Sequence, residues 1–388
     1  MERITRKKIR EKKKGINFFG EFIKIKKHFF RNIEKWMKSV KDPRHPSYIK
    51  YETDALLFPM IMKNACGIRS MGNMTEKFNK EECIRNMAAV LGYEQLEELP
   101  HYDTINNFLS RLDPAEIERI RNCMIRELFK KRSLEGCRLF GKYWCIAVDA
   151  TRLYSFSEKH CGHCLKAEYK NTDTGEVERT VYYHTVLEAK LIIGDMAFSI
   201  ATEFIENEDE DVSKQDCELN AFKRLAGKLK EMYPRLPICL LGDSLYACDP
   251  VFEICRANKW RYLLRFKDGR IKTVAEDFRA IKDLEERKKE NLAWVNGIAY
   301  NEREVNLIEA EEETKDGDRK HFVFITDIRI TERNADELVC AGRSRWRIEN
   351  EGFNSQKTKI GFIEHANSRN YNAMKNHYLI VQIAEILR

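Results

Sequence analysis

The sequence predicts an α/β protein in which helices flank a mixed β-sheet. Two short apolar runs, residues 143–149 and 237–243, are typical of strands buried on both faces of a sheet. Residues 180–192 and 196–204 predict a hairpin joined by a tight Gly-Asp turn. A helical pattern at residues 213–233 separates this hairpin from the second apolar run, as expected of an α/β fold.

Each apolar run ends in a carboxylate, Asp149 in the first and Asp243 in the second. Residues 150–152 interrupt the first run, so we expect its strand to end at Asp149, at the carboxyl edge where open α/β sheets bind ligands. An Asp after a strand often caps the following turn. For one strand alone, that structural role is favoured.

Size and composition exclude several protein classes. With 388 residues and 43% hydrophobic content, the chain can form a packed core in two domains, or in one large domain with insertions. No apolar run approaches the roughly 20 residues of a membrane span, and no secretory signal is apparent. The 12 cysteines have no framework spacing, which predicts free thiols in a cytoplasmic protein. Without an apolar run of spanning length, no membrane partner is expected.

The positive charge is concentrated at the N-terminus. Residues 1–45 contain 16 Lys and Arg against 5 Asp and Glu, whereas the net charge of the whole chain is only +7. This arm predicts phosphate contacts with a polyanion, although a solvated tail is the alternative. Apolar residues between Phe18 and Trp36 recur every three or four positions and predict an amphipathic helix. The candidate phosphate contacts of the arm are Lys7, Lys8, Lys12, Lys13 and Lys14.

Residues 51–131 have helical patterns. Asp113 followed by Pro114 predicts a capped helix start, directly after a helix that begins near His101. Such a helix pair could read DNA, but bundle packing is favoured on these residues alone. Residues 270–332 predict short strands between charged turns, a β-rich insertion that precedes a long helix from Asn334.

A third carboxylate lies on that long helix. A buried stripe that includes Trp346 is predicted for its apolar positions. At 100° per residue, Glu349 lies about 60° around the helix from Trp346, whereas Glu351 lies about 140° away. Glu349 is therefore the residue that can face the sheet. Arg345, one turn earlier, could contact phosphate, although an ordinary ion pair with Glu349 is favoured on spacing alone. The stripe consists of Val339, Trp346, Phe353 and Ile360.

Asp149, Asp243 and Glu349 are separated by 94 and 106 residues, so only the fold could bring them together. Clustered carboxylates suit Mg²⁺, which prefers oxygen ligands. Two such ions about 3.5–4 Å apart support phosphoryl transfer on DNA.

The order of these elements, with the block from Arg345 to Glu349, resembles the DDE transposases of bacterial insertion sequences. The resemblance covers about residues 140–365. It is closest to the group whose last block reads Tyr-x-x-Arg-x-x-x-Glu, followed by six residues and Lys. It implies a ribonuclease-H-like catalytic domain at 139–388 with its β-rich insertion, preceded by a basic arm at 1–48 and a helical DNA-binding domain at 49–138.

The resemblance also implies the chemistry and the partners. Asp149, Asp243 and Glu349 would bind two Mg²⁺ or Mn²⁺ ions for DNA cleavage and strand transfer. The partners would be terminal inverted repeats, target DNA and a second copy of the chain in a synaptic complex. The location would be the bacterial cytoplasm, on the nucleoid when DNA is bound. The alternatives are a catalytically silent DNA-binding regulator and a metal-dependent nuclease that does not join strands.

Two positions depart from the family block. Gly342 stands at the Tyr position and Gln356 at the Lys position, with Lys357 one residue later. One extra residue near Gly352, accommodated as a π-bulge, would explain this shift. The implied DNA contacts are therefore Arg345, Trp346 and Lys357.

The run from His160 to Cys164 is a separate candidate site. Cys161 and Cys164 have zinc-ligand spacing, and His160 and His163 lie beside them. Four ligands within five residues cannot easily surround one ion, so a polar loop is favoured over zinc. For His184, in the long predicted strand, ordinary packing is favoured.

Overall fold

The computed structural model describes residues 18–207, 214–284, 288–289, 291–313 and 319–388. The chain forms two compact units, one of Met1–Lys131 with Gln356–Arg388 and one of Arg132–Ser355. The C-terminal segment therefore packs with the N-terminal helices, whereas the predicted catalytic domain ran to residue 388. The functions assigned to residues 1–48, 49–138 and 139–388 remain predictions.

The first unit is helical. Its helix α14 (Tyr371–Leu387) is nearly all buried, in contact with α4, α7 and α8. The other elements are α2 (Phe18–Phe29), α3 (Ile33–Lys38), the short 3₁₀ helix η1 (Pro46–Tyr48), α4 (Thr53–Ala65), α5 (Met71–Phe78), α6 (Glu81–Leu91), α7 (Tyr102–Leu109), α8 (Pro114–Lys130) and α13 (Asn354–Thr358), which spans the boundary between the units.

Packing explains two features of these helices. The predicted helix from Phe18 to Trp36 is wrong as a single helix, because the chain breaks after Phe29 and buries Phe30 and Ile33. The turn between α7 and α8 is held by α14, whose Asn376 donates to the carbonyls of Leu109 and Leu112 at 2.8 Å each. This contact supports bundle packing for the α7–α8 pair.

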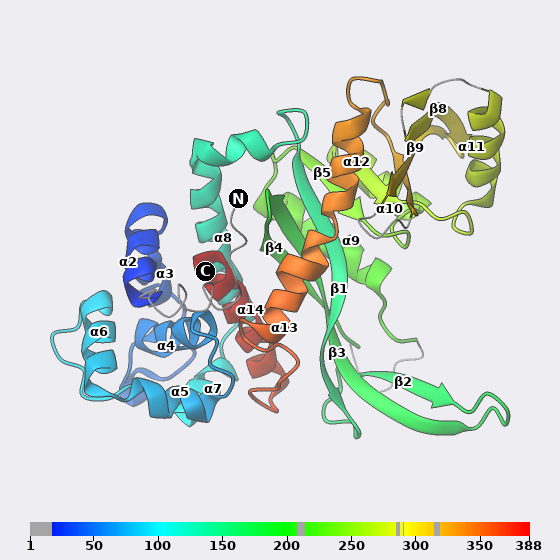
Figure 1. Cartoon of the computed structure of the whole chain (residues 1–388). Helices are drawn as coiled ribbons and strands as arrows, with labels where there is room; N and C mark the ends of the chain where they lie inside the picture. Colours follow the sequence, from blue (N-terminus) through cyan, green and yellow to red (C-terminus); the bar gives the residue numbers. More distant parts are fainter. Residues whose placement is uncertain (1–17, 208–213, 285–287, 290, 314–318) are drawn as a thin grey trace. The chain divides into compact units, whose positions relative to one another are not determined.

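The second unit contains one mixed sheet, in which the described residues form ten strands (Figure 1). The sheet order is β2-β3-β1-β5-β6-β10-β9-β8-β7, with β4 paired to β3. The strands are β1 (Trp144–Phe156), β2 (Leu165–Lys170), β3 (Val177–Ile193), β4 (Met196–Ile205), β5 (Ile238–Gly242), β6 (Arg261–Arg265), β7 (Lys288–Lys289), β8 (Leu292–Tyr300), β9 (Arg303–Glu313) and β10 (Arg319–Thr326).

The predicted β-rich insertion also contains a helix that the sequence analysis did not identify, α11 (Lys272–Leu284). The last strand of the insertion, β10, joins the main sheet by pairing with β6. The remaining helical elements of this unit are the 3₁₀ helix η2 (Arg132–Cys137), α9 (Glu218–Met232), α10 (Asp249–Asn258), α12 (Ala335–Ser344) and the π-helix η3 (Ile348–Phe353).

Strand β1 is longer than predicted. The expected end at Asp149 is wrong, because β1 continues to Phe156 through its antiparallel pairing with β3. Its parallel pairing with β5 nevertheless ends at Ala147, opposite Leu241. Asp149 therefore lies where β1 and β5 separate, even though it is inside a strand.

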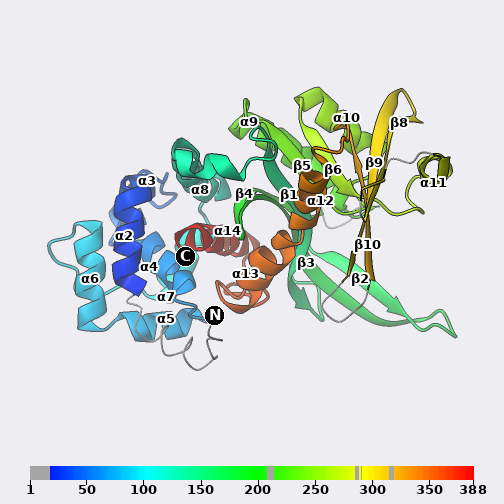
Figure 2. The same ribbon diagram turned by 45° about the horizontal axis from the view of Figure 1, so that its top comes forward.

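Helix α12 and the π-helix cover one face of the sheet, with α9 and α10 on the other (Figure 2). One hydrophobic core lies between the sheet and the helical segment of α12 and η3. From the sheet it contains Cys145 and Ala147 of β1 and Cys239 and Leu241 of β5. From the helical segment it includes Ile348. Because side chains alternate along a strand, Asp149 and Asp243 point to this same face. No helix among the described residues is long and apolar enough to span a membrane.

Candidate functional site

Asp149 in β1 and Asp243, the residue directly after β5, occupy equivalent register positions where these two parallel strands separate. Every paired residue of β1 precedes its partner in β5 by 94 positions, and the two aspartates have that same separation. Asp149 Oδ1 accepts a hydrogen bond from the Ala150 amide at 2.9 Å. Asp243 Oδ1 accepts one from Leu245 at 2.8 Å, so it also caps the turn after β5.

Glu349 and Arg345 reach this edge from the helix. Arg345 Nη1 lies 2.8 Å from Glu349 Oε1 and 3.5 Å from Asp149 Oδ2, so one guanidinium group links the two carboxylates. The Arg345 side chain is only 12% exposed, whereas that of Glu349 is 41% exposed. The structure thus places Arg345, Glu349 and Asp149 together beside Asp243, which lines a cavity with Arg345.

The helix geometry explains why Glu349 faces the sheet. The predicted stripe is wrong at Trp346, which is 53% exposed, while Ile348 is fully buried instead. The cause is a change of helix type: Ile348 N–H bonds to Arg345, three residues back, whereas Asn354 N–H bonds to Glu349, five residues back. The π-bulge predicted near Gly352 is confirmed by η3, and Glu351 is exposed.

The electrostatics of the site favour a cation. Burial raises the pKa of Asp149 to about 7; Arg345 opposes this shift, while the charges of Glu349 and Glu218 add to it. Burial also raises the pKa of Glu218, against the hydrogen bond that the Tyr246 hydroxyl donates to it at 2.6 Å. Burial therefore makes ionisation of Asp149 and Glu218 costly, and a bound divalent cation would offset that cost.

The raised pKa gives a testable pH dependence. The folded protein binds the Asp149 proton more tightly than the unfolded chain, in which the pKa is near 3.8. With chelator present, this group should lower the free energy of unfolding as pH rises from about 4 to 8, by up to a few kcal/mol. Asp149→Asn cannot ionise, so it should lack this component, as urea denaturation at about pH 5 and pH 8 can measure.

The control for this measurement is Glu351→Gln on the same helix. It should follow the wild-type pH dependence because Glu351 is exposed. A wild-type protein and an Asp149→Asn variant that lose equal stability between the two pH values would contradict the raised pKa.

Gly342, at the Tyr position of the family block, is explained by packing. A Cβ atom built there would lie 2.7–2.9 Å from ring atoms of Phe324, closer than real contacts allow. The aromatic surface next to Arg345 comes instead from β10 and from Trp346. A cavity of about 240 Å³ is lined by Asp243, Ser244, Arg265, Lys267, Phe322, Phe324, Gly342, Arg343, Arg345 and Trp346.

Gly342→Ala should destabilise the protein by about 1–3 kcal/mol, because the added methyl group forces Phe324 or α12 to move. Gly227→Ala in α9 is the matched control. Its Cβ would meet nothing within 4 Å, so this change should stabilise the helix by roughly 0.5–1 kcal/mol. Urea denaturation of both variants measures the two effects, and equal shifts would contradict the packing argument.

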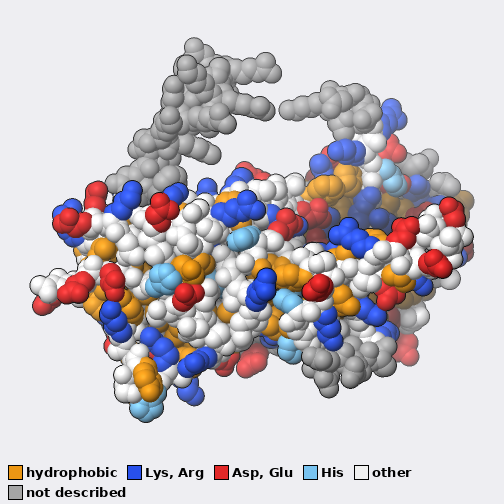
Figure 3. Space-filling view, turned by 90° about the horizontal axis from the view of Figure 1, so that it is seen from below, with side chains coloured by type: hydrophobic (Ala, Val, Ile, Leu, Met, Phe, Trp, Pro, Cys, Tyr) orange, Lys and Arg blue, Asp and Glu red, His pale blue; other side chains and the backbone are white. Residues whose placement is uncertain are grey.

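For the other predicted residues, the structure gives their own surroundings or does not describe them. Lys357 forms an ion pair with Glu364 at 3.0 Å, whereas Gln356 is buried and donates to Glu385. Cys161 and Cys164 lie together in the connection between β1 and β2. On the face shown in Figure 3, basic and acidic side chains are interspersed. Lys7, Lys8, Lys12, Lys13 and Lys14 lie outside the described residues.

Two groups of site residues were missed by the sequence analysis. Glu218 begins α9 and is identified only by the fold, because no sequence pattern links it to Asp243. Arg265 is the last residue of β6 and Lys267 lies two residues beyond it, a strand-end signal like that of Asp243 after β5. Burial lowers the pKa of Arg265, with a further contribution from Arg345. Its Nη1 has no hydrogen-bond partner among the described residues.

Comparison with known families agrees with this architecture. The profile of a family described as the transposase DDE domain matches residues 140–387. A family described as associated with that domain matches residues 35–124. Among curated proteins, none matches the chain.

Proposed function

Because the chain belongs to the transposase DDE domain family, we propose that it binds the terminal inverted repeats of its element and catalyses metal-dependent DNA cleavage and strand transfer. In this proposal Asp149, Asp243 and Glu349 hold two divalent cations, Mg²⁺ or Mn²⁺. The DNA and a second copy of the chain would assemble into a synaptic complex.

One observation carries the assignment of the site. Asp149 of β1 and Asp243, which directly follows the parallel strand β5, lie at equal register and face the helical segment whose Arg345 contacts both Asp149 and Glu349. Capping the turn after β5 would be a sufficient structural role for Asp243 alone. It does not explain why three acidic side chains lie at one edge of the sheet. The buried Asp149 carboxylate supports a cation ligand, because a cation would offset the cost of its burial.

Each part of the site has a role in the proposed reaction. Bound metal ions would activate the attacking oxygen and stabilise the leaving oxygen. Arg345 can pair with a DNA phosphate through the guanidinium group that now contacts the carboxylates. Arg265, Lys267 and Arg343 add positive charge to the cavity beside Asp243. Exposed Trp346 offers an aromatic face to a nucleotide.

In the reaction, water attacks a phosphodiester at the transposon end and releases a 3′-hydroxyl group. That hydroxyl group then attacks a phosphodiester of the target DNA, so one bond forms as another breaks. Both steps use the same carboxylates, because each displaces an oxygen from phosphorus. Lys357 and the N-terminal lysines would bind DNA phosphates.

The test is a joining assay with the DNA that flanks the gene. Labelled terminal repeats and a supercoiled target plasmid are incubated with the full chain in Mg²⁺, and cleaved ends joined to the plasmid are expected. DNA that is bound but left uncut would instead identify a silent regulator. Nicking without joined product would identify a nuclease. The mass of the protein–DNA complex tests the proposed dimer.

A further inference from the structure

We propose that His160, Cys161, Cys164 and His184 form a tetrahedral zinc site that fixes the base of the β2–β3 hairpin. Their ligand atoms all lie within 4.8 Å of one another. Two histidines and two cysteines are a donor set typical of structural zinc. The fourth ligand, which the loop sequence alone does not supply, comes from β3.

The distances suit one small ion at the centre of the four side chains. Cys161 Sγ lies 3.5 Å from both Cys164 Sγ and His184 Nε2, and Cys164 Sγ lies 3.6 Å from His184 Nε2. His160 Nδ1 lies 2.9 Å from Cys164 Sγ. Ligands bound to zinc at about 2.0–2.3 Å in a tetrahedron are roughly 3.3–3.8 Å apart. Only a small adjustment of His160 is therefore needed.

The surroundings hold the site in place. Cys164 and His184 are buried, and the His160 ring lies against the Phe156 ring with centroids 4.1 Å apart. The loop is also tied to the segment after β4, where the Asn207 side chain donates to the Cys164 carbonyl at 2.9 Å. This geometry positions the donor atoms before any metal binds.

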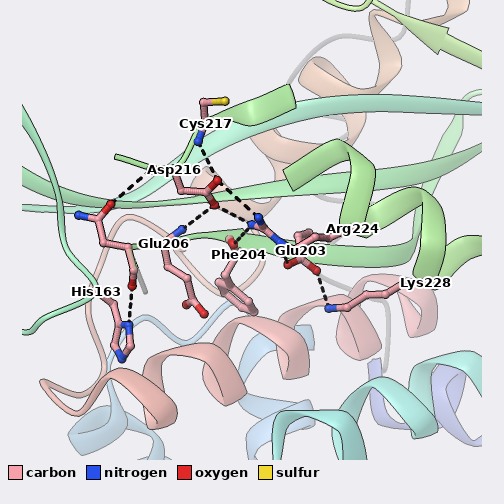
Figure 4. A network of polar contacts seen from close by, with 9 residues as sticks. His163, Glu203, Phe204, Glu206, Asp216, Cys217, Arg224 and Lys228 are labelled. Carbon is pink, nitrogen blue, oxygen red and sulfur yellow. Dashed lines mark hydrogen bonds and ion pairs between the residues drawn. The ribbon is translucent and has the colours of Figure 1, made fainter. Parts of the chain in front are cut away.

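His163, the other histidine of the loop, is not one of the four ligands. Its Nδ1–H donates to the Asn207 carbonyl at 2.9 Å. From there a polar network continues through Asp216 to Arg224, which pairs with both Asp216 and Glu203 (Figure 4). His163 therefore provides a matched control: a neighbouring imidazole with a different role.

The position of His184 indicates what the metal would do. Tyr183 of β3 pairs with β2, whereas Thr185 pairs with β4, so His184 lies where the neighbour of β3 changes. Beyond it, Val177–Val181 pair with β2 alone and extend as a two-stranded arm (Figure 1). An isolated hairpin is marginally stable in water. A zinc ion at its base would join the β1–β2 connection to β3.

The site is separate from the carboxylates. His184 lies four residues along β3 from Glu188, the register partner of Asp149, a separation of about 13 Å at the usual strand rise. Four protein ligands leave no open position for a substrate, which indicates a structural role. Binding would release the two thiol protons to solvent and leave a centre with no net charge, suited to its partly buried location.

The test begins with the full chain, purified in reducing buffer without chelator. Mass spectrometry should find about one zinc per chain. Exchange with Co²⁺ should produce the absorption of tetrahedral cobalt, together with thiolate-to-cobalt charge transfer. Chelation should lower the melting temperature and should increase tryptic cleavage within the arm, at Lys166, Lys170 and Arg179.

Variants identify the ligands. Cys161→Ser and His184→Gln should each weaken Zn²⁺ binding by at least about tenfold, whereas His163→Gln should keep wild-type zinc content. Asp149→Asn should also keep its zinc, which separates this site from the carboxylates. The proposal is overturned if the wild-type chain binds neither Zn²⁺ nor Co²⁺, or if Cys161→Ser and His184→Gln retain wild-type affinity. Should a variant not fold, cobalt titration of the wild-type chain decides.

Discussion

Asp149→Asn, Asp243→Asn and Glu349→Gln should each reduce DNA strand cleavage and joining by roughly 10³-fold or more. Each substitution keeps the shape of the side chain but removes a negative charge that would hold a metal ion. A metal ion contributes several kcal/mol to phosphoryl transfer, and each 1.4 kcal/mol corresponds to about tenfold in rate. Cleavage of labelled terminal DNA measures the loss, and DNA binding should persist.

Glu351→Gln is the matched control for these variants. Glu351 lies two residues from Glu349 on the same π-helix, but it is exposed. Its substitution should leave cleavage close to wild type. An Asp149→Asn or Glu349→Gln variant that cleaves as fast as Glu351→Gln would remove that residue from the proposed metal site.

Lys190→Met should have the largest effect on stability, a loss of about 3–5 kcal/mol. Lys190 and Glu188 are fully buried, with Nζ 2.8 Å from the Glu188 carboxylate. Lys190 also donates to Ser199 at 2.7 Å, and the Ser199 hydroxyl donates to Glu188 at 2.7 Å. Removing the ammonium group would leave the Glu188 carboxylate buried without its cation.

This pair also supports the candidate site. Glu188 is the register partner of Asp149, and a Cβ added to Gly352 would lie 2.8 Å from the Lys190 side chain. The π-helix therefore packs directly on Lys190. Loss of Lys190 should loosen the segment that carries Glu349, so we expect cleavage to fall as well.

Urea denaturation measures the stability effect. Lys24→Met is the control because Lys24 is 74% exposed in its ion pair with Glu21, and such a pair contributes at most about 1 kcal/mol. Adding Glu188→Gln to Lys190→Met should recover part of the lost stability, because it removes the buried charge. A Lys190→Met variant as stable as Lys24→Met would contradict the role of the buried pair.

The sequence predicted the elements that have strong local patterns. The run ending near Asp243 and the β3–β4 hairpin form close to their predicted bounds, the run ending at Asp149 begins as predicted, and the β-rich insertion contains the expected short strands. The shift of Lys357 in the family block also predicted the π-bulge. Each of these signals is contained within a few consecutive residues.

Two of the failures involve contacts between distant residues, and one follows from a change of helix type. Asp149 is inside a strand because β3 continues to pair with β1 where β5 no longer does. Trp346 is exposed because the change of helix type alters the angle between successive side chains around the helix axis. The stripe was calculated for a regular α-helix. His184 joins the cysteines of a loop some 20 residues earlier only through the path of β3. No local pattern contains these contacts.

The most direct test of the proposed metal site is a change in metal preference. Mg²⁺ demands oxygen ligands, whereas Mn²⁺ accepts sulfur more readily. In Asp149→Cys, the rate of strand cleavage in Mn²⁺ relative to Mg²⁺ should rise about tenfold or more above the wild-type ratio. Glu351→Cys should leave that ratio unchanged. If the ratio for Asp149→Cys also stays at the wild-type value, Asp149 does not bind the catalytic metal.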